Sequence, residues 1–74
     1  MTVEVKTFAT LRTVYPPVPE MEISEGESIG SLVDRLGIPR EKITIIFINN
    51  IHGTFDSPVK GGDSIGLFPP IGGG

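Results

Sequence analysis

The one segment with a helical repeat of apolar residues most restricts how this chain can fold. In SIGSLVDRLG (residues 28–37), apolar side chains follow the spacing of a single helical face at Ile29, Leu32, Val33 and Leu36. Ser28 is a candidate N-cap, and Gly37 stands where a left-handed C-cap glycine belongs, with Pro39 soon after it. Gly30, which disfavours a helix interior, would allow close packing against a sheet. A chain with one such helix must bury its other apolar residues in strands.

Much of the remaining sequence has the alternation or the apolar runs that are typical of strands. These patterns predict a central strand at 42–48, a short edge strand at 51–55 and three others, at 3–9, 20–24 and 64–68. The segment at 13–19 is rich in proline and is expected to be a loop. Phe8, at the end of the first strand, is expected in the core. The expected fold is therefore a two-layer α+β domain over residues 1–68, with a mixed sheet of four to five strands and one main helix.

Composition argues against several classes of function. The chain has no cysteine and one histidine, so disulfides and thiolate zinc sites are excluded. Its net charge is −3 and its six basic residues are scattered, which argues against a nucleic-acid surface. No apolar run approaches the roughly 20 residues of a membrane span. His52 has no accompanying nucleophile motif, so we expect no self-sufficient active site, and we expect a soluble, cytoplasmic protein with no nucleic acid or membrane as partner.

The last residues, FPPIGGG (68–74), are harder to explain by stability. Glycine adds no side chain to a core and loses the most conformational freedom on ordering. The α-carboxylate of Gly74 is ionised at neutral pH and can react only after activation, for instance as a mixed anhydride with AMP. Extended, residues 69–74 reach about 20 Å, enough to enter the active site of another protein. These features indicate a flexible tail over residues 69–74 that delivers its C-terminus; a frayed end is the alternative.

Three stretches give the chain a resemblance to a known family. FATLR (8–12) is similar to the segment after the first strand in the small subunit of molybdopterin synthase, a ubiquitin-like β-grasp sulfur carrier. FPPIGGG resembles the F-P-P-V-x-G-G ending of that family. INNIHGTFDSPVKGGDSI (48–65) resembles its V-N-G…D…L-x-D-G-D-x-V stretch, with matches at Asn49, Asp56, Val59, Lys60, Gly62, Asp63 and Ile65. The sequence departs from the pattern at three positions, which are Asn50, Gly61 and Gly72.

The resemblance implies a ubiquitin-like β-grasp fold and a carrier without catalytic groups of its own. An E1-like adenylyltransferase would use ATP to activate the Gly74 carboxylate, and a sulfur donor protein would convert it to a thiocarboxylate. The tail would then enter the large catalytic subunit of molybdopterin synthase, in a heterotetramer, and give its sulfur to a pterin precursor of the molybdenum or tungsten cofactor. The chain itself would bind no cofactor. Gly72 and Gly73 would give clearance in both partners, and the docking residues would be Phe68, Pro69, Pro70, Ile71 and Arg12.

The sequence leaves other functions open. Carriers for thiamine synthesis or tRNA thiolation share the Gly-Gly end, although the thiamine carriers generally lack the F-P-P before it. Ubiquitin-like modifiers share the fold and the activation step but form an isopeptide bond to a lysine. A β-grasp interaction module would use none of this tail chemistry. The sequence does not name the metal, the sulfur donor or the activating enzyme.

Overall fold

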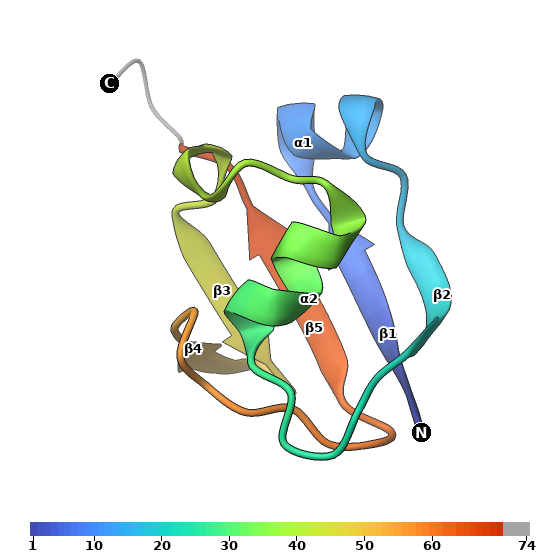
Figure 1. Cartoon of the computed structure of the whole chain (residues 1–74). Helices are drawn as coiled ribbons and strands as arrows, with labels where there is room; N and C mark the ends of the chain where they lie inside the picture. The colour runs from blue at the N-terminus through green and yellow to red at the C-terminus, as the bar shows by residue number, and fades with distance from the viewer. Residues whose placement is uncertain (71–74) are drawn as a thin grey trace.

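A five-stranded mixed sheet forms one layer of the computed structural model, which describes residues 1–70 (Figure 1). The strands lie in the order β2-β1-β5-β3-β4; β1 and β5 are parallel, and the other neighbours are antiparallel. The elements in chain order are β1 (Thr2–Thr7), α1 (Ala9–Val14), β2 (Val18–Glu22), α2 (Ile29–Leu36), the 3-10 turn η1 (Arg40–Lys42), β3 (Ile45–Ile48), β4 (Ile51–Gly53) and β5 (Ser64–Phe68). The predicted two-layer α+β class is confirmed.

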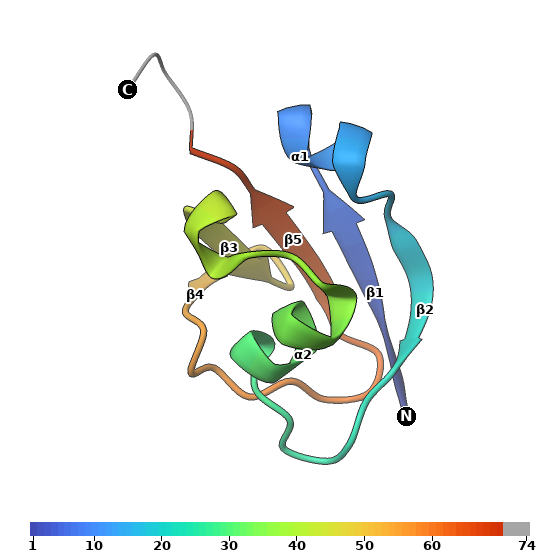
Figure 2. The same ribbon diagram turned by 45° about the horizontal axis from the view of Figure 1, so that its top comes forward.

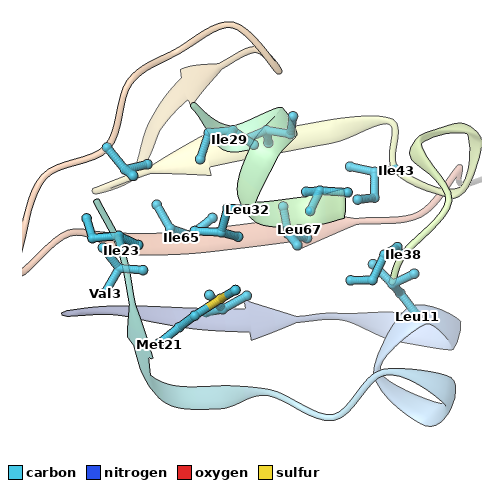
Figure 3. Packing of buried hydrophobic residues seen from close by; sticks show 14 residues of the cluster. Val3, Leu11, Met21, Ile23, Ile29, Leu32, Ile38, Ile43, Ile65 and Leu67 are labelled. Carbon is cyan, nitrogen blue, oxygen red and sulfur yellow. The ribbon is translucent and has the colours of Figure 1, made fainter. Parts of the chain in front are cut away.

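Helix α2 covers one face of this sheet and closes the core (Figure 3). Ile29, Leu32 and Val33 of α2 are fully buried, as are Ile65 and Leu67 of β5. Both predicted caps are confirmed. The Ser28 hydroxyl accepts a hydrogen bond from the Ser31 amide at 3.1 Å, and Gly37 has a left-handed φ of 76°. The helix therefore forms where its apolar face and its two end signals agree.

The predicted strand at 42–48 is an interior strand, as expected, although the middle position of the sheet belongs to β5. β3 lies between β5 and the edge strand β4, and it begins only at Ile45. The residues before it form η1, which the Ile43 amide closes by donating to the Arg40 carbonyl at 3.0 Å. β5 is central because it pairs with both β1 and β3, through contacts distant in sequence that local patterns do not reveal.

A second, shorter helix, α1, occupies a segment that was predicted as strand end and loop. Of its residues only Leu11 is buried. Helix α1 therefore lacks the apolar stripe from which an amphipathic helix is predicted. The chain enters α1 through Ala9 in a left-handed conformation, with φ of 54°. The Thr7 hydroxyl donates to the Tyr15 carbonyl at 2.6 Å and ties the end of the helix back to β1.

Gly30 was expected to allow close packing against the sheet, but it makes room for Arg40 instead. A Cβ built on Gly30 would lie 2.6 Å from Nη2 of Arg40 and 3.2 Å from the carbonyl oxygen of Phe55. The missing side chain thus makes room for Arg40, whose guanidinium lies 5.2 Å over the Phe55 ring and pairs with Asp34 at 3.0 Å. The prediction that Gly30 allows packing against the sheet was wrong, because its side-chain direction faces η1 and the loop after β4.

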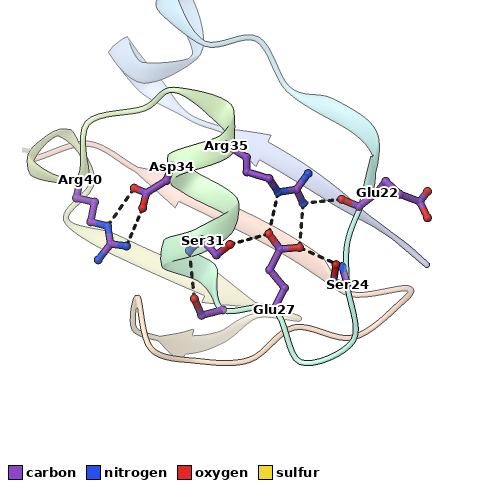
Figure 4. A network of polar contacts seen from close by, with 8 residues as sticks. Glu22, Ser24, Glu27, Ser31, Asp34, Arg35 and Arg40 are labelled. Carbon is purple, nitrogen blue, oxygen red and sulfur yellow. Dashed lines mark hydrogen bonds and ion pairs between the residues drawn. The ribbon is translucent and has the colours of Figure 1, made fainter.

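A carboxylate fastens α2 to the connection that precedes it (Figure 4). The Glu27 side chain is 8% exposed and accepts hydrogen bonds from the Ser24 amide, the Ser31 hydroxyl, and both Nε and Nη2 of Arg35, at 2.8–3.1 Å. Arg35 also donates to the carbonyl of Glu22, at the end of β2, at 2.6 Å. The hydrogen bonds from Arg35, followed by that from Ser24, lower the pKa of Glu27 to about 2.

Replacing Glu27 with Gln should lower the free energy of unfolding by about 2 kcal/mol at neutral pH, because a charge-assisted pair with Arg35 is lost. The pKa of Glu27 is about 2 in the folded chain against 4.5 ordinarily, so its stabilisation is complete above pH 4.5 and fades as the pH falls toward 2. Urea unfolding at several pH values would measure both effects. Glu25→Gln, an exposed neighbour, is the matched control. Equal unfolding free energies for Glu27→Gln and the wild type at pH 7 would contradict this account.

Replacing Ala9 with Gly should raise the free energy of unfolding by about 0.5 kcal/mol. A left-handed conformation costs an alanine about 1–2 kcal/mol, and the added chain entropy of glycine offsets only part of that relief. Thr10→Gly, one residue further into the same helix, is the control and should lower stability by about 0.5–1 kcal/mol. Denaturant midpoints that fall for both variants would show that Ala9 is not strained.

Candidate functional site

The root of the predicted tail is the carboxyl end of β5, which is held on both sides. The Phe8 amide donates to the Leu67 carbonyl at 3.2 Å, and the Thr44 amide donates to the Phe68 carbonyl at 2.8 Å. Because β1 runs parallel to β5, helix α1 lies at this same edge of the sheet (Figure 2). The backbone is therefore fixed as far as Phe68, and α1 stands beside the point where the tail begins.

Three aromatic rings gather on the face of the sheet that α2 leaves uncovered; we call Phe8, Phe47 and Phe68 the aromatic cluster. The rings of Phe8 and Phe68 are stacked with centroids 4.3 Å apart, and Phe47 meets Phe68 edge-on at 5.7 Å. Gly66 lies beneath them, where a Cβ would come within 3.4 Å of the Phe8 ring. All three phenylalanines are half-buried, so the cluster presents apolar surface at the tail root.

Phe8 was predicted to lie in the core. It does not lie under α2 with the other core residues. Along β1 the residues Val3, Val5 and Thr7 are buried against the helix layer, so Phe8 continues on the opposite face with Glu4 and Lys6. That alternation was visible in the sequence. It did not reveal that Phe8 would find Phe68 as a stacking partner, because this contact depends on the pairing of the first strand with the last.

Arg12 lies next to this surface. It is exposed in the last turn of α1 and lines, together with Phe8 and Lys6, a shallow groove of about 330 Å³. Within residues 1–70 Arg12 forms no ion pair, whereas Lys6 lies 3.8 Å from Glu4. The structure thus brings a predicted docking residue, Arg12, to the border of the aromatic cluster.

The remaining predicted site residues divide into two groups. Pro69 is buried and Pro70 is exposed, so the chain leaves the domain between them. Ile71, Gly72, Gly73 and Gly74 lie outside the described residues, and their roles stay predictions, as does the boundary between domain and tail.

In residues 48–65, which resemble the molybdopterin synthase small subunit, Asn49 and Asp63 form a hydrogen-bonded contact between two turns. The buried Asp63 carboxylate accepts hydrogen bonds from the Asn49 side chain at 2.9 Å and the Lys60 amide at 2.8 Å. The side-chain oxygen Oδ1 of Asn49 accepts a hydrogen bond from the Ser64 amide at 2.9 Å. Asn50, which stands where the family usually has glycine, adopts φ of 68°, a conformation that asparagine tolerates. These residues join the turn between β3 and β4 to the start of β5 and so fix β5 in register.

Residues 1–70 contain no group of three or more histidine, cysteine, aspartate or glutamate side chains placed to hold a metal ion. No helix in this described part is long and apolar enough to cross a membrane.

Comparison with known proteins identifies the family to which this chain belongs. The model of the ThiS family matches residues 5–74, so the chain belongs to the ThiS family of ubiquitin-like sulfur carriers. None of the curated proteins compared matches the sequence. Members of the family are generally non-catalytic carrier subunits.

Solved structures confirm the ubiquitin-like β-grasp fold. SAMP1 from Haloferax volcanii is similar with a TM-score of 0.79 at 21% identity, covering 100% of both chains. A Pyrococcus furiosus protein assigned by name as molybdopterin converting factor subunit 1 has a TM-score of 0.75 at 25% identity, covering 96% of this chain and 99% of its own. A chain in the Helicobacter pylori complex of molybdopterin-converting factor subunits 1 and 2 has a TM-score of 0.59 at 26% identity, covering 100% of both chains.

Proposed function

We propose that this chain is the sulfur-carrying small subunit of a molybdopterin synthase. The observation that carries the proposal is that the family match runs through Gly74 and therefore includes the terminal glycines. Two similar structures, at 25% and 26% identity, are described as subunits of a molybdopterin converting factor. The F-P-P before the glycines favours this pathway over thiamine synthesis.

The chemistry takes place on the Gly74 carboxylate. An E1-like adenylyltransferase joins one carboxylate oxygen to the α-phosphorus of ATP, and pyrophosphate leaves. The sulfur donor then attacks the carbonyl carbon. With a protein persulfide as the donor, its terminal sulfur forms the carbon–sulfur bond as the bond to AMP breaks, which gives an acyl disulfide. A second thiol of the donor protein then attacks the donor's sulfur and breaks the sulfur–sulfur bond; the donor is left with a disulfide and Gly74 with a thiocarboxylate. This chain has no cysteine, so that thiol comes from the donor. Adenylation is needed because a free carboxylate is a poor electrophile and AMP is a good leaving group.

The tail root supplies the docking surface in this scheme. The aromatic cluster offers half-buried rings next to the point where the chain leaves the domain, and Arg12 adds a cation at its border. Aromatic residues and arginine contribute most strongly to protein interfaces. The large catalytic subunit, in a heterotetramer, is therefore proposed to bind the docking residues Phe68, Pro69, Pro70, Ile71 and Arg12. Gly72 and Gly73 then pass into its active site. ATP is used by the activating partner, and this chain binds no cofactor.

The intact mass of the protein isolated from its own host, without reducing agent, should show one oxygen replaced by sulfur, mapped to the C-terminal peptide. Loss of the gene should abolish molybdopterin formation and leave thiamine synthesis unchanged. A thiamine requirement in its place would reassign the pathway within the family. Lysine-linked adducts in the extract, with no thiocarboxylate, would instead establish a ubiquitin-like modifier.

Replacing Gly73 with Trp should reduce adenylation of Gly74 at least about a hundredfold, because an indole cannot follow the backbone through a channel shaped for glycine. Adenylation would be followed by release of pyrophosphate with the activating enzyme. The midpoint of thermal unfolding should not change, since residue 73 follows the last strand. Glu25→Trp, at an exposed position in the turn before α2, is the control for the added bulk and should be adenylated like the wild type. Normal adenylation of Gly73→Trp would refute the proposed clearance role.

A further inference from the structure

A groove of about 340 Å³ lies at the same edge of the sheet as the tail root, between α1 and η1. We call it the proline groove, after two of its lining residues. It shares no residue with the aromatic cluster. The residues on which the argument depends are Leu11, Val14, Tyr15, Lys42, Pro69 and Pro70. The tail therefore begins between two separate surfaces, one aromatic and one that its own prolines help to form.

The proline groove has an apolar wall that the fold leaves exposed. Val14 is 67% exposed, and the only other large exposed hydrophobic residues within 1–70 are Met1 and Ile51. Neither of these two lines the groove. Leu11, at 4% exposure, belongs to the core and gives the groove a rigid floor. Lys42 is exposed at the rim and forms no ion pair with another residue of the described part of the chain.

The backbone at this point restricts how a partner can hold it. Pro69 and Pro70 have no amide N–H, so a partner strand cannot accept hydrogen bonds from the chain at these two positions. Extension of the sheet by strand pairing is therefore weakened where the tail begins. Recognition of the root therefore depends more on side-chain packing, and the proline groove provides apolar surface for it apart from the aromatic cluster.

We propose that the proline groove is a second docking surface for the large subunit, and that it accepts an apolar side chain between Val14, Tyr15 and Pro70. This inference rests on the proposed function, since it needs a partner that receives the tail. The groove is continuous with the surface assigned to that partner through Pro69 and Pro70. The large subunit thus holds the root from two sides, which fixes the direction in which the tail leaves the domain.

The test measures the affinity of the full-length chain for the large subunit from the same organism by isothermal titration calorimetry. Val14→Glu should weaken binding about tenfold or more, because a carboxylate would be desolvated in an apolar contact. Ile51→Glu is the matched control: Ile51 is 71% exposed and lies on β4, outside the groove. It should change the affinity by less than about threefold, as a surface substitution away from the interface does. Val14→Ile should bind like the wild type. Thermal unfolding verifies that each variant is folded.

The outcomes separate this inference from the proposed function. Wild-type affinity in Val14→Glu would overturn the second docking surface while leaving the carrier function in place. An equal loss in Val14→Glu and Ile51→Glu would overturn it too, because added negative charge alone would explain the result. A wild-type chain that does not bind the large subunit would overturn both. Selective loss in Val14→Glu establishes the groove as part of the interface.

Discussion

The parallel pairing of β1 with β5 is the constraint on which the other features of this structure depend. It joins the first strand to the last in register from Glu4 opposite Ser64 to Thr7 opposite Leu67. Parallel strands end at the same edge of a sheet, so the segment that follows β1 and the segment that follows β5 must lie side by side. The first of these segments is α1, with Arg12, and the second is the tail root. No other pairing in this sheet would bring them together.

Strand β5 also joins the core to the candidate site, because its successive side chains point to opposite faces. Ile65 and Leu67 are fully buried under α2, whereas Gly66 and Phe68 face the aromatic side. The backbone of Phe68 cannot shift without loosening the hydrogen bonds at the Leu67 and Phe68 carbonyls. The backbone beneath the aromatic cluster is therefore held by the sheet. Rigidity of this kind lowers the entropic cost of binding.

Local patterns predicted much of this fold and less of its site. The caps and apolar face of α2 are encoded within ten residues, and each strand was predicted near its place. The strand predicted at 20–24 is displaced, because β2 (Val18–Glu22) begins inside the predicted loop at 13–19. Helix α1 could not be predicted in this way, since it buries one residue and its first turn has no side-chain cap. The central place of β5 and the contact of Phe8 with Phe68 depend on pairings between distant segments. The proline groove is a further product of such pairings.

The chemistry of the tail root bears on how a carrier can serve two partners in turn. A carrier must leave its activating enzyme before it reaches the next protein, so neither complex can be held indefinitely. Differences in affinity among related complexes arise mainly from dissociation rates. Pro69 and Pro70 remove two backbone donors at the position where a paired strand would otherwise extend the interface. Under the proposed function, side-chain contacts at the aromatic cluster and the proline groove hold the large subunit in place of a paired strand. In that function, the loss of two backbone hydrogen bonds at the tail root favours a complex that can dissociate.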